Sequence, residues 1–173
     1  MQYIFESNRL YYRKFEIEDA QILFDLNADI KVIQYTGDQA FNNMADAKKF
    51  IQNYRDYDLY GIGRWMMIHK STNAVLGWCG LKYMPDLQEI DLGYRLFQEY
   101  WNQGYATEAS LASLKYGFEV KQYDEIVGRA WKINLASIRV LEKCGMVFWK
   151  DAIFDHQAGS YYKITKSEYL NKI

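Results

Sequence analysis

The sequence predicts one domain of the α/β (α+β) class, a mixed, mostly antiparallel, twisted sheet of about six to seven strands with helices on both faces. Its 173 residues fit a single domain on the usual scale of roughly 100–200 residues. Half of the residues are apolar and 17% are aromatic, which is enough for one large core. Strand and helix patterns follow in the order βααβββαβαββ without a linker or repeat, so residues 1–173 are expected to form one unit.

The first half of the chain predicts a strand, two helices and a β-hairpin. Two-residue alternation marks the strands, whereas apolar residues at three- and four-residue spacing mark the helices. Turn-forming residues separate the two hairpin strands. The predicted elements are a strand over 9–15, a helix introduced by Ile17-Glu18-Asp19, a helix over 44–57 and strands over 64–69 and 74–84.

A strand predicted over residues 89–97 is interrupted by a glycine. Its even-numbered positions are apolar, and Glu89, Asp91 and Arg95 share the opposite face with Gly93. A glycine inside a strand often marks a bulge or a close backbone approach. We therefore expect a bulge or a close backbone approach at Gly93.

The second half alternates helices and strands. A broad apolar stripe predicts a helix, and a glycine at position 145 ends the next one. The predicted elements are helices over 104–120 and 134–144, and strands over 125–131, 146–154 and 160–165.

Charge and cysteine usage exclude several classes of function. The 21 basic and 22 acidic residues nearly cancel, which argues against nucleic-acid and membrane-surface partners. With no export signal or bilayer-spanning apolar run, a cytoplasmic location is expected. Cys79 and Cys144 should then be reduced and buried, and His69 and His156 are too isolated to predict a metal site.

The segment from Trp101 to Thr107 carries the clearest signal for a ligand. Gly104 and Ala106 follow a strand and open a helix, so backbone amides can face an anion at the positive end of the helix dipole. A pyrophosphate would fit such a turn. The alternative is an ordinary turn in which Gly104 only supplies its backbone angles.

Three segments together resemble the GCN5-related N-acetyltransferases. They are the strand 89–96, the turn 100–109 and the helix 134–146 with its sequence NLASIRVLEKCGM. The opening residues 8–20 also resemble this family, so the similarity covers nearly the whole chain. The similarity is greatest to the branch that acetylates ribosomal-protein N-termini, including N-terminal alanine, and other amines.

The resemblance implies that acetyl-coenzyme A is the co-substrate and that its pyrophosphate binds the amides from Gln103 onward. Trp101 stands where the family usually has Gln or Arg, and Asn102 replaces the branch's customary glycine. The strand backbone at 94–96 is expected to run beside the pantetheine arm, with a splay beginning at Gly93 that separates this strand from the strand over 125–131. The coenzyme-binding residues implied are Tyr94, Arg95, Leu96, Trp101, Asn102, Gln103, Gly104, Tyr105, Ala106, Thr107, Asn134 and Ser137.

Candidate catalytic groups follow from the same resemblance. Asp91 occupies the strand position of the family's catalytic glutamate and is the leading general base, with Glu89 as a second candidate. Alternatively, both carboxylates pair with Arg95 on a solvated face. Ser137 is expected to steady the leaving thiolate, although Asn134 and Ser137 are equally explained as the start of a helix.

The expected partners are acetyl-coenzyme A and a primary amine, either a protein N-terminus or a small molecule. The acetyl group would pass directly between them in a ternary complex, with the protein acting as a monomer or homodimer. Two other hypotheses stay open, a non-catalytic acyl-coenzyme A sensor and a protein-interaction module. Acceptor specificity is expected to lie in residues 30–41 and in the terminal strands.

Overall fold

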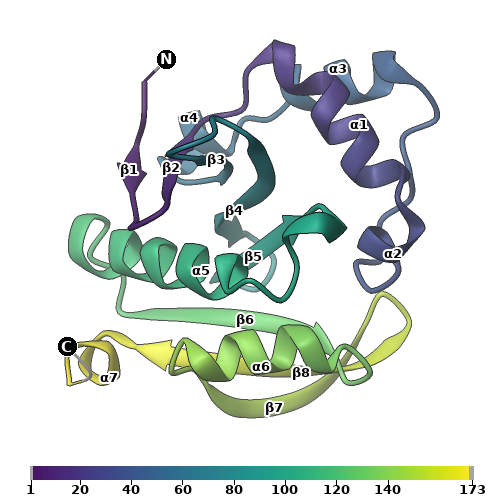
Figure 1. The fold of residues 1–173 in the computed structure, drawn as a ribbon. Helices are drawn as coiled ribbons and strands as arrows, with labels where there is room; N and C mark the ends of the chain where they lie inside the picture. The colour runs from purple at the N-terminus through teal and green to yellow at the C-terminus, as the bar shows by residue number, and fades with distance from the viewer. Residues whose placement is uncertain (1, 172–173) are drawn as a thin grey trace.

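A computed structural model describes residues 2–171 of the chain, with one eight-stranded sheet at its centre (Figure 1). The strands lie in the order β1-β2-β3-β4-β5-β6-β8-β7, and the only parallel pair among the described strands is β5 with β6. The predicted mixed, mostly antiparallel sheet is confirmed. The sheet has one strand more than the six to seven expected. The additional strand is β1 (Phe5–Glu6), which is short and lies near the N-terminus.

The N-terminal half contains strands β1 to β4 and four short helices. Helix α3 is capped by Asn43, the residue before it, whose side chain accepts a hydrogen bond from Asp46 N. The elements are β1 (Phe5–Glu6), β2 (Leu10–Arg13), the 3₁₀ turn η1 (Ile17–Asp19), α1 (Ala20–Ala28), α2 (Ile30–Ile33), α3 (Met44–Gln52), α4 (Asp56–Tyr60), β3 (Arg64–His69) and β4 (Val75–Met84).

The C-terminal half contains the remaining strands and the longest helix. Helix α5 continues directly into a π-helical segment, η3, which ends before β6. The elements are β5 (Glu89–Leu96), η2 (Gln98–Tyr100), α5 (Tyr105–Lys115), η3 (Tyr116–Val120), β6 (Glu125–Trp131), α6 (Leu135–Lys143), β7 (Val147–Phe154), β8 (Gln157–Thr165) and α7 (Lys166–Leu170).

Helices cover both faces of the sheet, as predicted. Helices α5 and α6 lie in front of β4 to β8 in Figure 1, whereas α1 to α3 lie above the other face of the N-terminal strands. Alternate strand residues therefore enter two cores. Trp65, Leu81 and Leu114 belong to the large core beneath α5 and α6, and Phe15 and Met66 belong to the smaller one beneath α1 and α3.

One helix predicted from the sequence is wrong, and three short elements were not predicted. The helix predicted over 44–57 is two helices, since α3 ends at Gln52 and α4 begins at Asp56. The tyrosines that follow α3 explain the break, because Tyr54 and Tyr57 turn inward and hydrogen-bond to the backbone of Arg64. Helices α2 and α7 and strand β1 were not predicted, because they are too short to show a period.

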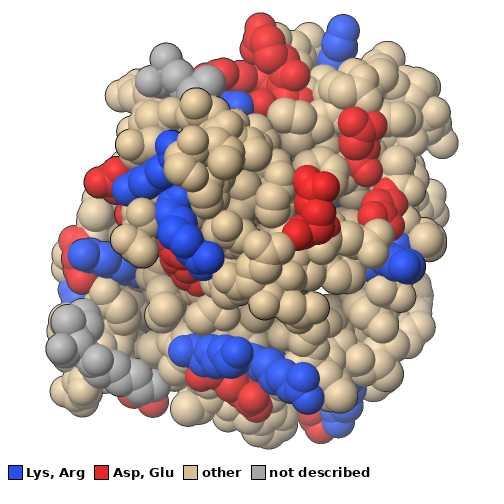
Figure 2. Space-filling view, in the orientation of Figure 1, with Lys and Arg blue, Asp and Glu red and all other residues tan. Residues whose placement is uncertain are grey.

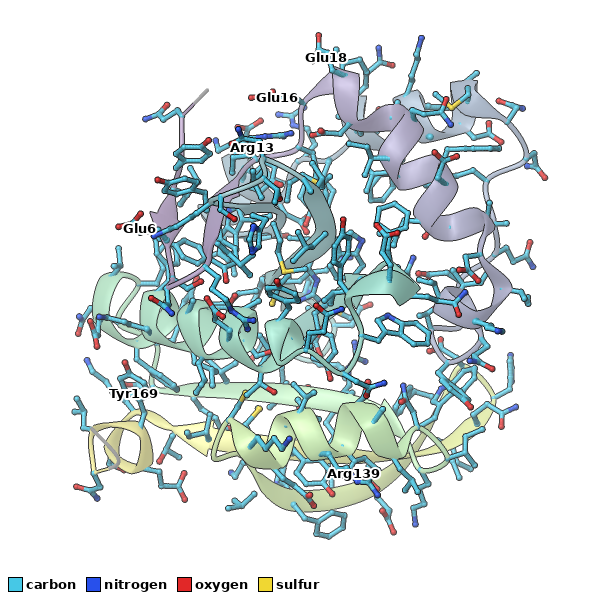
Figure 3. All side chains as sticks on the ribbon, viewed as in Figure 1. Glu6, Arg13, Glu16, Glu18, Arg139 and Tyr169 are labelled. Atoms are coloured by element: carbon cyan, nitrogen blue, oxygen red, sulfur yellow. The ribbon has the colours of Figure 1, made fainter. Side chains whose placement is uncertain are left out.

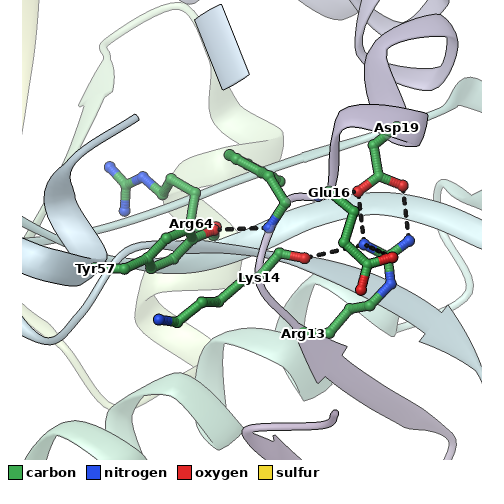
Figure 4. A network of polar contacts seen from close by, with 7 residues as sticks. Arg13, Lys14, Glu16, Asp19, Tyr57 and Arg64 are labelled. Atoms are coloured by element: carbon green, nitrogen blue, oxygen red, sulfur yellow. Dashed lines mark hydrogen bonds and ion pairs between the residues drawn. The ribbon is translucent and has the colours of Figure 1, made fainter. Parts of the chain in front are cut away.

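A buried ion pair fixes the start of α1 (Figure 4). Arg13 donates to both carboxylate oxygens of Asp19, at 2.6 and 2.7 Å, and the two side chains are 5% and 3% exposed. A further bond runs from Arg13 to the carbonyl of Lys14. Because one guanidinium faces one carboxylate, the charges balance inside the protein.

Strands β5 and β6 separate where the sequence predicted. They are paired at Asp91 opposite Val127 and at Leu92 opposite Gly128, and the pairing ends there. Beyond this point Gly93 and its successors pair with β4 on one side only. We call this unpaired stretch, residues 93–96 of β5 and 129–131 of β6, the splay.

Candidate active site

The turn before α5 has the geometry of an anion site. Gly104 has φ +81°, a left-handed conformation that favours glycine, and α5 starts at Tyr105. Among the described residues no side chain caps this helix start. The first-turn amides of Tyr105, Ala106 and Thr107 therefore remain available to a ligand at the positive end of the helix dipole.

Two unusual residues of the turn have structural explanations. Asn102 has φ +58°, and asparagine tolerates the left-handed region better than most side chains, so it can replace a glycine there. Trp101 donates from Nε1 to the carbonyl of Leu96 at 2.9 Å. This bond links the turn to the end of β5. It also occupies the Leu96 carbonyl, which was expected to face the coenzyme.

Arg9 lies over the turn, a role that the sequence reasoning missed. Its guanidinium stacks 4.0 Å from the ring of Tyr105 and donates to the carbonyl of Gln103 at 3.1 Å. Another of its nitrogens lies 3.6 Å from where a Cβ on Gly104 would be. A cation thus stands beside the free amides, and the signal for it was the Asn8-Arg9-Leu10 segment already noted in the family resemblance.

Glu108 in the first turn of α5 holds Arg9 in this place. The carboxylate accepts from Arg9 Nε at 2.6 Å, from Arg9 N at 2.7 Å and from Ser7 Oγ at 2.8 Å. Burial alone would raise the pKa of Glu108, but these hydrogen bonds outweigh it and the pKa is lowered. Glu108 therefore anchors the N-terminal strands to the turn as an anion.

The helix-covered side of the splay brings Tyr94 to α6. Tyr94 Oη donates to the carbonyl of Ser137 at 3.3 Å, so the side chain crosses from β5 to the first turn of α6. Asn134 caps that helix by accepting from Ser137 N at 3.1 Å. The capping explanation is thus confirmed for the Asn134 oxygen, while the Asn134 amide nitrogen can still donate to a ligand.

Asp91 lies on the opposite side of the sheet, within a cluster of two arginines. One oxygen accepts from Arg64 at 2.5 Å and the other from Arg129 at 3.1 Å. Asp91 is only 5% exposed. The hypothesis that Asp91 pairs with Arg95 on a solvated face is wrong, because Asp91 is buried and its partners come from β3, two strands away, and from the adjacent strand β6.

Arg95 and Glu89 also have partners other than those expected. Arg95 is buried and pairs with Asp38 and Asn27, which lie on the segment after α2 and on α1. Glu89 Oε1 lies 3.9 Å from Lys150, and its Oε2 is buried with no hydrogen-bond partner in the described part of the chain. Glu89 and Asp91 thus share a face but occupy separate clusters.

The absent side chain of Gly93 makes room for the arginine of this cluster. A Cβ at Gly93 would lie 2.6 Å from Arg64 Nη2 and 2.7 Å from its Cζ. The close approach predicted at Gly93 is therefore that of a guanidinium. Arg129 remains charged, since burial lowers its pKa but Asp91 and a hydrogen bond with Tyr161 outweigh this effect and the net shift is upward.

The cysteines are packed in the core, as expected. Both are free and buried, and burial raises the pKa of Cys79 to about 11 and that of Cys144 to about 12. Neither is a thiolate near pH 7, so an acyl-cysteine mechanism has no nucleophile here.

Figures 2 and 3 show the outer surface around α6. Lysine and arginine side chains run across the front of this helix, and Arg139 projects away from the sheet.

Within residues 2–171, no three His, Cys, Asp or Glu side chains gather in a way that could hold a metal ion. Nor is any helix of that range long and apolar enough to cross a membrane.

Comparison with known proteins identifies the family. The model of the acetyltransferase (GNAT) domain matches residues 9–147. The uncharacterized N-acetyltransferase p20 of Bacillus licheniformis is 31% identical over 137 residues, which are 78% of this chain and 77% of p20.

Two solved structures share the fold. The GNAT-family acetyltransferase of Bacillus anthracis superposes with a TM-score of 0.81 at 27% identity, covering 94% of this chain and 98% of that one. The spermidine N-acetyltransferase of Vibrio cholerae, solved with CoA and spermine, has a TM-score of 0.80 at 19% identity, covering 94% and 99%. Enzymes of the GNAT family use acetyl-coenzyme A. The chain belongs to the GNAT family of acetyltransferases and is an N-acetyltransferase.

Proposed function

We propose that this enzyme transfers an acetyl group from acetyl-coenzyme A directly to a primary amine, without a covalent acyl-enzyme. The observation that carries the proposal is the splay of β5 and β6, which opens beside the uncapped start of α5. Unpaired strand backbone can bind an extended ligand arm, and free helix amides can bind its phosphates. One ligand with both features is coenzyme A.

The coenzyme would be held mainly by backbone groups. The amides of the Gln103–Thr107 turn would bind the pyrophosphate, and the Arg9 guanidinium, which Glu108 holds 4.0 Å from the ring of Tyr105, would donate a charge-assisted hydrogen bond. The backbone of Tyr94 and Arg95 would bind the pantetheine arm. Asn134, which uses its oxygen for the helix cap, would contribute its amide nitrogen.

The coenzyme supplies an activated acetyl group, and the protein has to supply a neutral amine and a proton for the thiolate. A free α-amine costs roughly 1–1.4 kcal/mol to deprotonate at pH 7, against about 4.6 kcal/mol for a lysine-like amine. Asp91 is the carboxylate nearest the splay along β5. Because both of its oxygens are engaged by arginines, we propose that it takes the proton through water.

On the other side of the splay, Ser137 and Tyr94 are the hydroxyl groups next to the proposed sulfur position. Burial raises the pKa of Tyr94, so this phenol stays protonated, and its one proton is donated to the carbonyl of Ser137. We propose that the Ser137 hydroxyl steadies the leaving thiolate. The acceptor is either a protein N-terminus, as in the ribosomal-protein branch that the sequence resembles, or a small molecule.

Calorimetric titration with acetyl-coenzyme A, followed by thiol release across a panel of peptides and small amines, tests the proposal. Asn134→Ala should weaken the binding of acetyl-coenzyme A. Lys115→Gln, an exposed change at the other end of α5, should bind it like the wild type. Absence of acetyl-coenzyme A binding would contradict the proposed site. Unchanged acetylation by Asp91→Asn across the pH range would remove Asp91 as the base.

A further inference from the structure

The side of the splay opposite α5 and α6 carries an excess of positive charge. Because Gly128 faces Leu141 of α6, its neighbour Arg129 faces away from the helices, as does Asp91 on β5. Asp91 is shared by Arg64 and Arg129, so this cluster has two guanidinium groups for one carboxylate. A buried cluster with one uncompensated charge is costly unless a ligand balances it.

Arg129 is the arginine of this cluster with an open edge. Its side chain is 21% exposed, against 12% for Arg64, and its bond to Asp91 uses only Nε. Its Nη2 lies 3.9 Å from Met84 Sδ, and its guanidinium lies 5.6 and 5.8 Å from the ring centroids of Phe154 and Tyr161. None of these neighbours is an anion, and a guanidinium can bind a carboxylate through parallel hydrogen bonds.

A second donor lies beside Arg129 on the same face of β6. Trp131 is two residues further along the strand, and its Nε1 is buried without an acceptor from residues 2–171. An indole N–H can only donate. Arg129 at its exposed edge and Trp131 at its unpartnered N–H can therefore both donate to an acceptor atom on one side of the splay.

The segment 35–38 closes over this side, and we call it the strap. Tyr35 meets the ring of Trp131 edge-on, with 6.4 Å between centroids, and Asp38 pairs with Arg95 of β5. At Gly37 an added Cβ would lie 2.6 Å from Asp155, in the turn between β7 and β8. The strap thus touches both strands of the splay and the hairpin beside them, which favours a small acceptor over a long chain.

We propose that the acceptor is a small primary amine with a carboxylate close to the amine, as in an amino acid. This inference rests on the proposed acetyl transfer. Arg129 binds the carboxylate, assisted by Trp131, and the amine points to the splay. Arg129 contacts Asp91, which lies two residues before Gly93, or about 7 Å along β5. Only a few bonds can therefore separate the carboxylate of the acceptor from its amine.

Chemically, the amine nitrogen forms the new C–N bond while the thioester C–S bond breaks. The amine proton leaves through water toward Asp91, the thiolate gains a proton, and the carboxylate is unchanged. A polyamine would place ammonium groups against Arg129 and is disfavoured by repulsion.

Matched pairs of amino acids and their α-carboxamides test the inference, because each pair differs only in the carboxylate. In thiol-release assays the acid should have a kcat/KM about tenfold to hundredfold above that of its amide, the worth of one charge-assisted contact. Arg129→Gln should abolish the preference. Lys115→Gln, which removes the same charge from an exposed site, should retain it.

Binding is measured separately by tryptophan fluorescence of the enzyme saturated with coenzyme A and titrated with the same pairs. Equal binding of acid and amide would overturn the inference, while thiol release with any amine would leave the proposed function intact. Binding that is selective for the acid and depends on Arg129 supports the inference even if no tested amine is acetylated. The absence of acetylation with every tested amine would instead contradict the proposed function. If Arg129→Gln does not fold by circular dichroism, Arg129→Lys, which keeps the charge but loses the fork, should still reduce the preference.

Discussion

Two arginine–carboxylate groups of this enzyme differ in charge balance. The closed pair, Arg13 with Asp19, joins one cation to one anion through two parallel bonds and is 5% and 3% exposed. The open cluster, Arg64, Asp91 and Arg129, joins two cations to one anion and leaves Arg129 21% exposed.

We infer from this difference that the closed pair serves the fold and that the open cluster can serve a ligand. An unpartnered donor does not distinguish the two, since the Nε of Arg13 is also buried without an acceptor in the described chain. The distinguishing features are the uncompensated charge and the exposed edge of Arg129. A balanced pair fixes α1, whereas the unbalanced cluster lies beside the splay where the acceptor is proposed to bind.

Breaking the closed pair should have the largest effect. Asp19→Asn leaves Arg13 buried without its anion and should lower the free energy of unfolding by about 3–5 kcal/mol. For a chain of 173 residues this corresponds to a fall in Tm of about 6–20 °C. Thermal and urea denaturation measure it. Glu16→Gln is the control, because Glu16 is 44% exposed and 3.9 Å from Arg13, and a loss as large as that of Asp19→Asn would refute the distinction.

Crowding the open cluster should have an intermediate effect. Gly93→Ala places a Cβ 2.6 Å from Arg64 Nη2, so the guanidinium must leave Asp91, at a cost of about 1–3 kcal/mol. The kcat/KM for the amine should fall, with the affinity for acetyl-coenzyme A nearly unchanged. Gly104→Ala is the matched control: its Cβ has space but its φ is +81°, so it should weaken coenzyme binding instead. Identical kinetic effects of both changes would contradict the assignment of the two sites.

Removing the open arginine should cost little stability. Arg129→Gln leaves Asp91 paired with Arg64 and removes the uncompensated charge, so the unfolding free energy should change by less than about 1 kcal/mol. Arg13→Gln in the closed pair should cost about 3–5 kcal/mol. Urea denaturation of both variants makes the comparison, and equal losses would show that the two groups are energetically alike.

The buried thiols are uncharged and provide a reference for the two charged groups. Their ionisation should not affect the free energy of unfolding at pH 7. Burial raises the pKa of Cys79 from 9.0 to about 11, so its contribution to stability is full below pH 9 and is lost as the pH rises from 9 to 11. Urea denaturation of wild type and Cys79→Ala at pH 8 to 11 should therefore show a steeper loss in the wild type. Rapid maleimide labelling of the native protein at pH 7 would contradict the burial of both thiols.

Much of the fold was predictable because its signals are local. Strand and helix periods placed β3 and β6 at their observed bounds, and Asn134 caps α6 as its position before an apolar stripe predicts. The helix start after Gly104 also follows from a glycine at a particular place in a pattern, whereas the separation of β5 from β6 at Gly93 was implied by the family resemblance. The residues of the anion turn could be named for the same reason.

The partners of Asp91 could be known only from the tertiary structure. Arg64 and Arg129 lie 27 and 38 residues away in sequence, on strands whose register and face decide which side chains meet. The same holds for Arg9 over the turn, which comes from 94 residues before Gln103. Local sequence determines where strands and turns form, because backbone preferences act over a few residues. Which charges face one another depends on how distant strands pair, and this pairing left Arg129 open to a ligand.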